Sequence, residues 1–225
     1  MSSKTPLDTT STEASDPAVS AKNAKKKKNV QSVIGQIGLD MIPVVAGILI
    51  ALFINNLQQN YRDKKLLEST LQSLSEEFKE NKENIDLLLP LQKRFLDTLQ
   101  HYKEDNTYSI FDIATKASKM GTPDIYSTNW QASLNNNSIQ LLNFQTIHLL
   151  SQIESKYREL KEQETMIASI TLGPPMFKTG EEGLEYRNGM ELWITSYIGN
   201  EEELLELYKK FEEIVRNKQY THDSQ

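Results

Sequence analysis

The stretch MIPVVAGILIALFI, residues 41–54, contains no charged side chain and none that forms hydrogen bonds. It follows a cluster of lysines at Lys22 and at residues 25–28. An apolar run with basic residues on its N-terminal side is typical of a membrane-spanning helix whose N-terminus stays in the cytoplasm. The sequence therefore predicts a single-pass membrane protein, with the chain from about Leu57 onward on the far side of the membrane.

The short apolar run leaves two starting points open for the span. Its 14 residues cover about 21 Å as a helix, against a hydrocarbon core of about 30 Å. Adding residues 55–58 extends the helix to about 27 Å, which a slightly thinned bilayer accommodates. A start at Val33 would instead place Asp40 inside the membrane, as a buried carboxylate on a proton path. We favour the start at Met41, because Asp40 as N-cap and Pro43 in the first turn are typical of a helix beginning.

An uncleaved signal anchor fits this region better than a buried core helix or a cleaved secretory signal. A core helix rarely follows four consecutive lysines. A cleavage site needs small residues just after the apolar region, whereas this chain has FINNL at residues 53–57. The chain contains no cysteine, so attachment of a lipid at a cysteine is excluded.

The N-terminal tail, residues 1–29, lacks aromatic residues and is rich in Ser, Thr, Ala and Asp, which predicts disorder. Its lysines have two interpretations, nucleic-acid binding and attraction to anionic lipid headgroups. From Leu57 onward the chain carries 19 basic and 27 acidic residues, a net charge of −8. An acidic body repels phosphate, so we expect no nucleic-acid partner and assign the lysines to the lipid bilayer.

A heptad stripe runs from residue 67 to residue 102, with nine of its eleven positions apolar or aromatic. The positions hold Leu67, Leu71, Leu74, Phe78, Asn81, Ile85, Leu88, Gln92, Phe95, Leu99 and Tyr102. Pro90 predicts a kink or break near Leu88 or Leu89. Residues 85–91 are apolar on nearly every face, which predicts burial on several sides.

The two polar positions of the stripe, Asn81 and Gln92, leave two interpretations open. If the stripe faces another copy of the chain, they specify register or partner. If they lie in water at the edge of a monomeric bundle, replacing them has little effect. We favour the second interpretation, and with it a monomer, because the stripe widens at residues 85–91 as it does in a globular bundle.

The rest of the chain also shows helical patterns. Asn143 caps a helix from Phe144 to Leu172, which the sequence GPP at residues 173–175 ends. Further segments are a weak helix at residues 110–120, a turn at 135–138, a loop at 180–189, a short helix at 190–198 and a last helix from Asn200. Four or five amphipathic helices with short connections predict an all-α fold, in which one transmembrane helix precedes a helical bundle with a long kinked first helix.

This organisation has five parts: a disordered basic-ended tail, an interfacial lead-in, a transmembrane helix, an extracytoplasmic helical bundle and a disordered C-terminal tail. They cover, in order, residues 1–30, 31–40, 41–58, 59–217 and 218–225.

The sequence contains no recognisable catalytic, cofactor-binding or metal-binding motif, so we expect neither an enzyme nor a cofactor. Serines form no nucleophile elbow and glycines form no phosphate loop. The remaining candidates are better explained as solvated helix positions or core anchors. They are His101, His148 and His222, the carboxylates at 76–77, 181–182, 201–203 and 212–213, and Trp130 and Trp193.

The run GILIALFINN at residues 47–56, followed by YRDKK at 61–65, resembles the opening of a family of small bacterial single-pass membrane proteins, known as domain of unknown function 6090. Residues 130–142 resemble a later segment of that family. Leu57 departs from its pattern, which has tryptophan there. The resemblance covers about residues 41–160 and implies no activity. The five lysines of the cluster precede the span, against Arg62, Lys64 and Lys65 just after it, so we expect a cytoplasmic N-terminus and a periplasmic C-terminal domain in the bacterial inner membrane.

Two functional classes remain. The first is a membrane-anchored interaction or scaffold protein of the bacterial envelope, with another envelope membrane protein as partner. The second is an extracytoplasmic ligand-binding sensor bundle that acts through a membrane partner. A sensor of the second class would need a partner to pass on its signal, because only about 40 residues precede the span on the cytoplasmic side.

Overall fold

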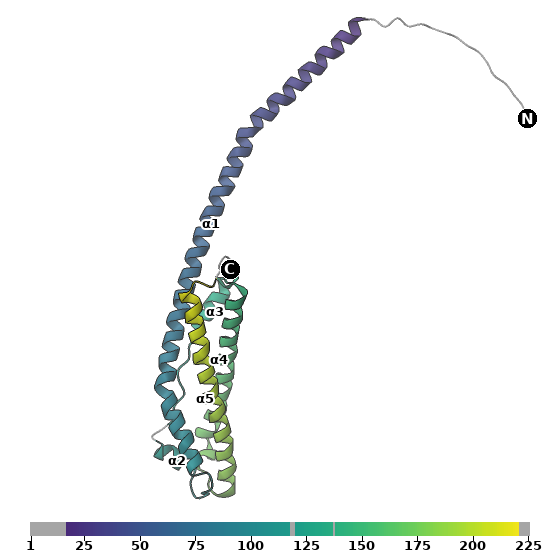
Figure 1. Cartoon of the computed structure of the whole chain (residues 1–225). Coiled ribbons are helices and arrows are strands. Elements are labelled where there is room, and N and C mark those ends of the chain that lie inside the picture. Colours follow the sequence, from purple (N-terminus) through teal and green to yellow (C-terminus); the bar gives the residue numbers. More distant parts are fainter. Residues whose placement is uncertain (1–16, 118–119, 137, 221–225) are drawn as a thin grey trace, which may run out of the picture. The chain divides into compact units, whose positions relative to one another are not determined.

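The computed structural model describes residues 17–117, 120–136 and 138–220, and for residues 17–40 it describes the backbone only. All regular structure in these ranges is helical (Figure 1), which confirms the all-α class. The α-helices are α1 (Pro17–His101), α2 (Ile110–Lys116), α3 (Thr128–Asn135), α4 (Phe144–Thr171) and α5 (Gly180–Arg216). Two short 3-10 helices, η1 (Ser138–Leu141) and η2 (Pro174–Phe177), complete the list.

The chain divides into two compact units, residues Met1–Asn60 (unit 1) and Tyr61–Gln225 (unit 2). In unit 1, every side chain from Met41 to Asn60 is exposed, including the whole apolar run. The most apolar 18-residue window of α1 has a mean hydropathy of 1.9, and none of it is buried. By length and composition, this helix can therefore cross a membrane.

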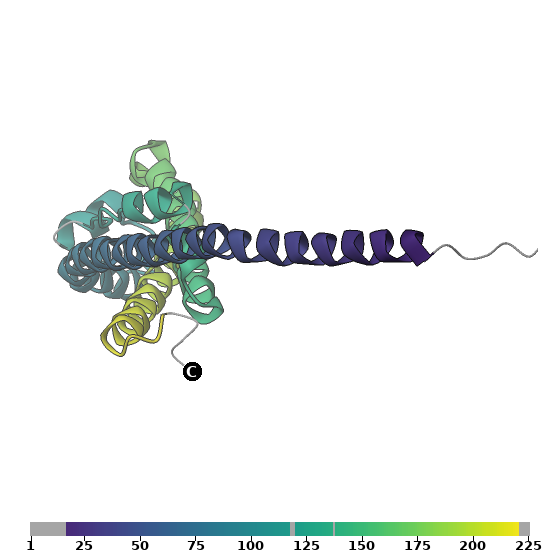
Figure 2. The same cartoon turned by 90° about the horizontal axis from the view of Figure 1, so that it is seen from above.

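The expected start of a helix at Asp40 is wrong, because α1 begins at Pro17 and runs through Asp40 and Pro43. Its ribbon is continuous from the purple end onward (Figure 2). Lys, Ala and Gln, which are frequent before Asp40, favour helix and let it extend upstream. Residues 17–30, where disorder was expected, have a helical backbone, while residues 1–16 lie outside the described ranges. The lead-in at 31–40 has a helical backbone, and its side chains lie outside the description.

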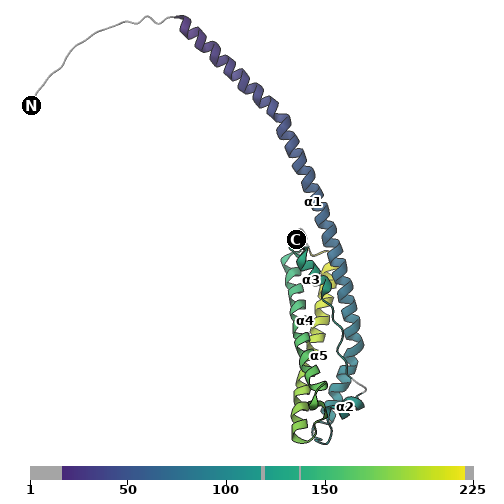
Figure 3. The ribbon, with the colours of Figure 1, turned by 180° about the vertical axis from the view of Figure 1, so that it is seen from behind.

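In unit 2, α1 turns the heptad stripe toward α4 and α5, which run alongside it (Figures 1 and 3). Nine of the eleven stripe positions are buried, and the other two, Leu88 and Tyr102, are partly buried. The stripe is therefore the core-facing side of α1 within one chain. The burial expected on several sides at residues 85–91 is wrong, because Leu87 is 72% exposed.

Pro90 does not break the helix, since α1 continues to His101. Both Pro90 and Asp86 are exposed. Water can therefore bond the Asp86 carbonyl, which would otherwise accept a hydrogen bond from the missing N–H of residue 90. A kink at this position remains a prediction.

Helix α5 replaces the loop, the short helix and the last helix that the sequence predicts between residues 180 and 216. Gly183, Gly189 and Gly199 all lie within α5. A glycine inside a helix costs about 1 kcal/mol. The apolar stripe of α5, with Met190, Ile194, Leu204, Leu207, Tyr208 and Phe211 buried, outweighs that cost.

Helix α4 agrees with the prediction, and the Oδ1 of its N-cap Asn143 accepts a hydrogen bond from the backbone N–H of Thr146 at 2.9 Å. The backbone N–H of Asn143 also donates to the Tyr220 carbonyl at 2.8 Å, and its side-chain amide donates to the Gln219 carbonyl at 2.7 Å. These bonds fix residues 219–220, where a disordered tail was expected; residues 221–225 lie outside the described ranges. Helix α2 lies within the weak helix predicted at 110–120, and α3 was not predicted.

Candidate functional site

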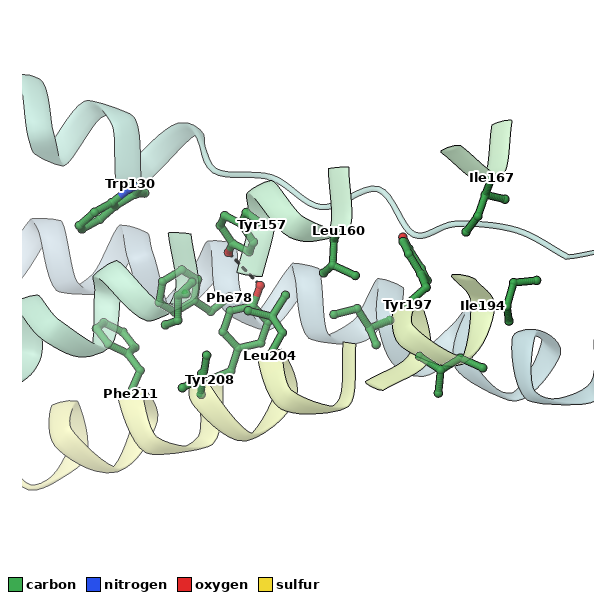
Figure 4. Packing of buried hydrophobic residues seen from close by; sticks show 14 of the residues in the cluster. Phe78, Trp130, Tyr157, Leu160, Ile167, Ile194, Tyr197, Leu204, Tyr208 and Phe211 are labelled. Carbon is green, nitrogen blue, oxygen red and sulfur yellow. Dashed lines mark hydrogen bonds between the residues drawn. The ribbon is translucent and has the colours of Figure 1, made fainter. Parts of the chain in front are cut away.

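Asn81 is fully buried, and its side chain joins α1 to three other parts of unit 2. Its Nδ2 donates to the Tyr126 carbonyl at 2.7 Å and to the Tyr157 hydroxyl at 3.0 Å. Its Oδ1 accepts from the Tyr126 N–H at 2.8 Å. The hydroxyls of Tyr157 and Tyr208 lie 2.8 Å apart (Figure 4), so the bonds link α4 and α5 as well. Asn81 therefore faces the core of its own chain, and its interpretation as a position in water is wrong.

Gln92 is also buried, and its Nε2 donates to two acceptors. One is Glu201 Oε1 on α5, at 3.0 Å, and the other is the Gly121 carbonyl, at 3.1 Å. Gln92 thereby holds the segment at residues 120–122 against α1. As with Asn81, the interpretation of Gln92 as a water-facing position is wrong.

The interpretation of Glu77 and Glu201 as solvated carboxylates is wrong too, because their side chains are buried. Glu77 Oε2 accepts a hydrogen bond from the Asn129 N–H at 2.7 Å and so fixes the start of α3. Burial raises the pKa of Glu77, although backbone hydrogen bonds around Asn129 oppose the shift. Burial raises the pKa of Glu201 to about 7, with the Gln92 hydrogen bond opposing it.

This raised pKa predicts that unit 2 loses stability as the pH rises. The unfolded chain ionises Glu201 above about 4.5, while the folded chain keeps the proton until about 7. The free energy of unfolding therefore falls across that window, by roughly 3 kcal/mol in total. Glu201→Gln should stabilise unit 2 relative to wild type at pH 8 and by much less at pH 5. Urea unfolding followed by tryptophan fluorescence measures this difference; an equal effect at both pH values would contradict the prediction.

An apolar cavity of about 850 Å³ lies at the end of unit 2 where α1 ends. We call it the end cavity. Its wall comes from α1, α2, α4, η2 and the segment at 120–122. The lining residues are Phe95, Ile110, Phe111, Ala114, Thr115, Met120, Gly121, Thr122, Glu164, Ile167, Ala168, Thr171 and Met176.

Local structure explains how this wall is held. Ser109 and Asp112 form a capping box at the start of α2, with the Ser109 N–H donating to Asp112 Oδ2 at 2.9 Å. Gln92 holds Gly121, as described above. Phe111 of α2 packs against Phe177 of η2, with ring centroids 5.2 Å apart. Small side chains such as Ala114 and Ala168 leave the volume open.

Among the described residues that line the end cavity, Glu164 is the one that is ionisable. Its Oε1 accepts a hydrogen bond from Thr122 Oγ1 at 3.3 Å, and its Oε2 pairs with Lys161 Nζ at 2.7 Å. The Lys161 side chain is 78% exposed, so solvent weakens this ion pair. The cavity thus combines a large apolar wall with one carboxylate.

Exposed apolar side chains lie on the elements that line the end cavity or next to them in the sequence. Phe111 is 46% exposed and lines it, and Phe177 of η2 is 63% exposed and packs against Phe111. Leu172, the C-cap of α4, is 88% exposed and directly follows the lining residue Thr171. We call these three residues the cavity rim. Apolar side chains that cluster on a surface are typical of binding sites.

The other candidates from the sequence do not come together. His101 and His148 are exposed, while His222 and the Asp40 side chain lie outside the description. Trp130 is buried in the core and Trp193 packs against it. In the residues that the structure describes, no group of three or more His, Cys, Asp or Glu side chains is placed to hold a metal ion.

Comparison with known proteins finds no matching family model, no matching curated protein and no matching solved structure. The features that bear on function are therefore structural: the helix with its exposed apolar run, the helical unit that follows it, and the end cavity.

Proposed function

We propose that this chain is a membrane-anchored helical interaction protein of the bacterial envelope. Residues 41–58 span the inner membrane with the N-terminus in the cytoplasm, and unit 2 lies in the periplasm and binds another membrane protein. One observation carries the proposal: the apolar run at 41–54 is wholly exposed on a helix that leads directly into a unit with its own core. An exposed apolar run of this length needs lipid around it.

The lysines at residues 25–28 support the orientation, because basic residues are retained on the cytoplasmic side. The resemblance of residues 41–160 to the bacterial family described above supports the same placement. A monomer is favoured because the stripe of α1 is already covered by α4 and α5 of the same chain.

The cavity rim supports a binding role for unit 2. The side chains of Phe177 and Leu172 are more than half exposed although the core of unit 2 is complete without them. Large apolar side chains that are kept in water are typical of interaction surfaces. A sensor of small molecules is the second candidate, and the end cavity is the observation that favours it.

Membrane placement predicts the behaviour of the protein in cell fractions. The full-length chain should stay with the membranes after a carbonate wash, because an apolar helix is not released by alkali. Protease added after the outer membrane is permeabilised should digest unit 2. Recovery in the soluble fraction would contradict the anchor, and a protected unit 2 would contradict the orientation.

Photocrosslinking in the same cells tests the binding role. A photoreactive phenylalanine analogue replaces Phe177 in the cavity rim, and a matched chain carries it at Leu87, which is similarly exposed but outside the rim. We expect a crosslinked product of defined mass from position 177 and none from position 87. Equal products from both positions, or none from either, would overturn the assignment of the rim as the binding surface.

A further inference from the structure

We infer that the end cavity is a binding site for a small apolar molecule that carries an amine group. This ligand goes beyond the proposed interaction function and does not depend on it. The inference is based on the size of the cavity, its apolar wall and the hydrogen-bonding groups that the wall presents.

The size and wall of the end cavity suit a small molecule. Its volume of about 850 Å³ falls within the range of about 300–1,000 Å³ that ligand pockets occupy. Phe95, Ile110 and Ile167 form part of the wall and are at most 3% exposed themselves. Water gains few hydrogen bonds from such a wall, so an apolar ligand displaces it at little cost.

The hydroxyl groups of the wall are already used as donors. Thr115 Oγ1 donates to the Phe111 carbonyl at 2.9 Å, and Thr171 Oγ1 donates to the Ile167 carbonyl at 2.9 Å. Thr122 Oγ1 donates to Glu164. The described side chains that line the cavity therefore offer a ligand acceptors and no spare donor.

Glu164 then selects the polar group of the ligand. A carboxylate has about four acceptor sites, and Thr122 and Lys161 each occupy one. An ammonium group can occupy those that remain, and it gains a charge-assisted hydrogen bond. A ligand with a carboxylate or phosphate would instead meet a like charge and, among the lining residues that the structure describes, find no cation. The ligand is therefore an apolar amine.

The absence of cysteine from the chain makes a direct test possible, because an introduced cysteine is the only thiol. Ala168→Cys places it in the wall of the cavity, and Ser151→Cys places it at an exposed position of the same helix, α4. The full-length variants are placed in lipid nanodiscs, and alkylation by N-ethylmaleimide is followed by intact mass. The probes are 4-phenylbutylamine and 4-phenylbutyrate, which share an apolar body and differ in charge.

We expect 4-phenylbutylamine to slow alkylation of the Ala168→Cys chain by about tenfold at a concentration near ten times its Kd. Alkylation of the Ser151→Cys chain should not change. 4-Phenylbutyrate should bind at least about tenfold more weakly, the difference that roughly 1.4 kcal/mol produces. Adding Glu164→Gln to Ala168→Cys should remove the preference for the amine.

Three results would overturn the inference: equal slowing by both probes, slowing by neither, or an unchanged preference for the amine with Glu164→Gln. If Ala168→Cys loses the tryptophan fluorescence of the folded protein, Thr171→Cys in the same wall replaces it. A failed crosslink at Phe177 would leave these rates unaffected, so the two proposals fail separately.

Discussion

Leu74→Asp is expected to unfold unit 2. Leu74 is fully buried in the stripe of α1. An unpaired carboxylate there either stays charged in an apolar environment or takes up a proton, and both cost several kcal/mol. A typical domain is stable by only about 5–15 kcal/mol, so the substitution removes much or all of the stability. Both tryptophans, Trp130 and Trp193, lie in unit 2. Their fluorescence during urea unfolding of the full chain in detergent therefore reports on this unit alone.

Leu87→Asp is the matched control for this substitution. It makes the same chemical change on the same helix, but Leu87 is 72% exposed. We expect its effect on the free energy of unfolding to stay within about 0.5 kcal/mol, as for most surface changes. If both variants unfold, α1 does not face the core as the stripe indicates. If neither unfolds, the core that the structure assigns to unit 2 is wrong.

The sequence predicts the helical framework of unit 2 well where one periodic pattern dominates. The stripe from Leu67 to Tyr102 repeats often enough to define one face of α1, and burial confirms that face. Helix α4 has both a cap at Asn143 and a terminator at residues 173–175, so its ends agree within one residue. These signals are local, because the residues that carry them lie in consecutive turns of one helix.

Prediction fails where local signals and tertiary packing disagree. Residues 180–189 were expected to form a loop, yet they belong to α5, whose apolar stripe outweighs the cost of the glycines among them. Asp40 and Pro43 suggested a helix start, but the residues before them favour helix as well. Local propensity is a weak signal that neighbouring turns and long-range contacts override.

The end cavity and the buried polar side chains lack a local signal altogether. The partners of Asn81 lie 45, 76 and 127 residues along the chain, and Glu201 lies 109 residues from Gln92. No spacing pattern joins positions so far apart. The cavity likewise depends on how α2 packs on η2 and how η2 packs on α4, and its small residues stand out only once the helices are in place. The polar residues of the stripe, Asn81 and Gln92, do indicate buried hydrogen bonds, since a polar residue in a core position needs buried partners.

Asn81→Leu is expected to destabilise unit 2 by about 3–5 kcal/mol. Leucine is close in size, but it leaves the N–H and the carbonyl of Tyr126 without the hydrogen bonds that Asn81 supplies at 2.8 and 2.7 Å. These two bonds are partly buried, and a buried group left unpaired costs about 1–3 kcal/mol. The Tyr157 and Tyr208 hydroxyls keep each other as partners, so they add less. Urea unfolding followed by tryptophan fluorescence measures the loss.

Asn84→Leu is the control that separates a buried network from a general effect of leucine on α1. Asn84 donates to the Asp124 carbonyl at 2.8 Å, in the same segment as Tyr126, but this bond is exposed to water. Water replaces an exposed partner, so the expected loss is at most about 1 kcal/mol.

Analytical ultracentrifugation of the Asn81→Leu chain should show the oligomeric state of the wild type, because Asn81 bonds within its own chain. A more stable Asn81→Leu protein with an altered oligomeric state would instead mean that the stripe faces a second copy, and that the contacts of Asn81 with Tyr126 and Tyr157 do not hold the fold.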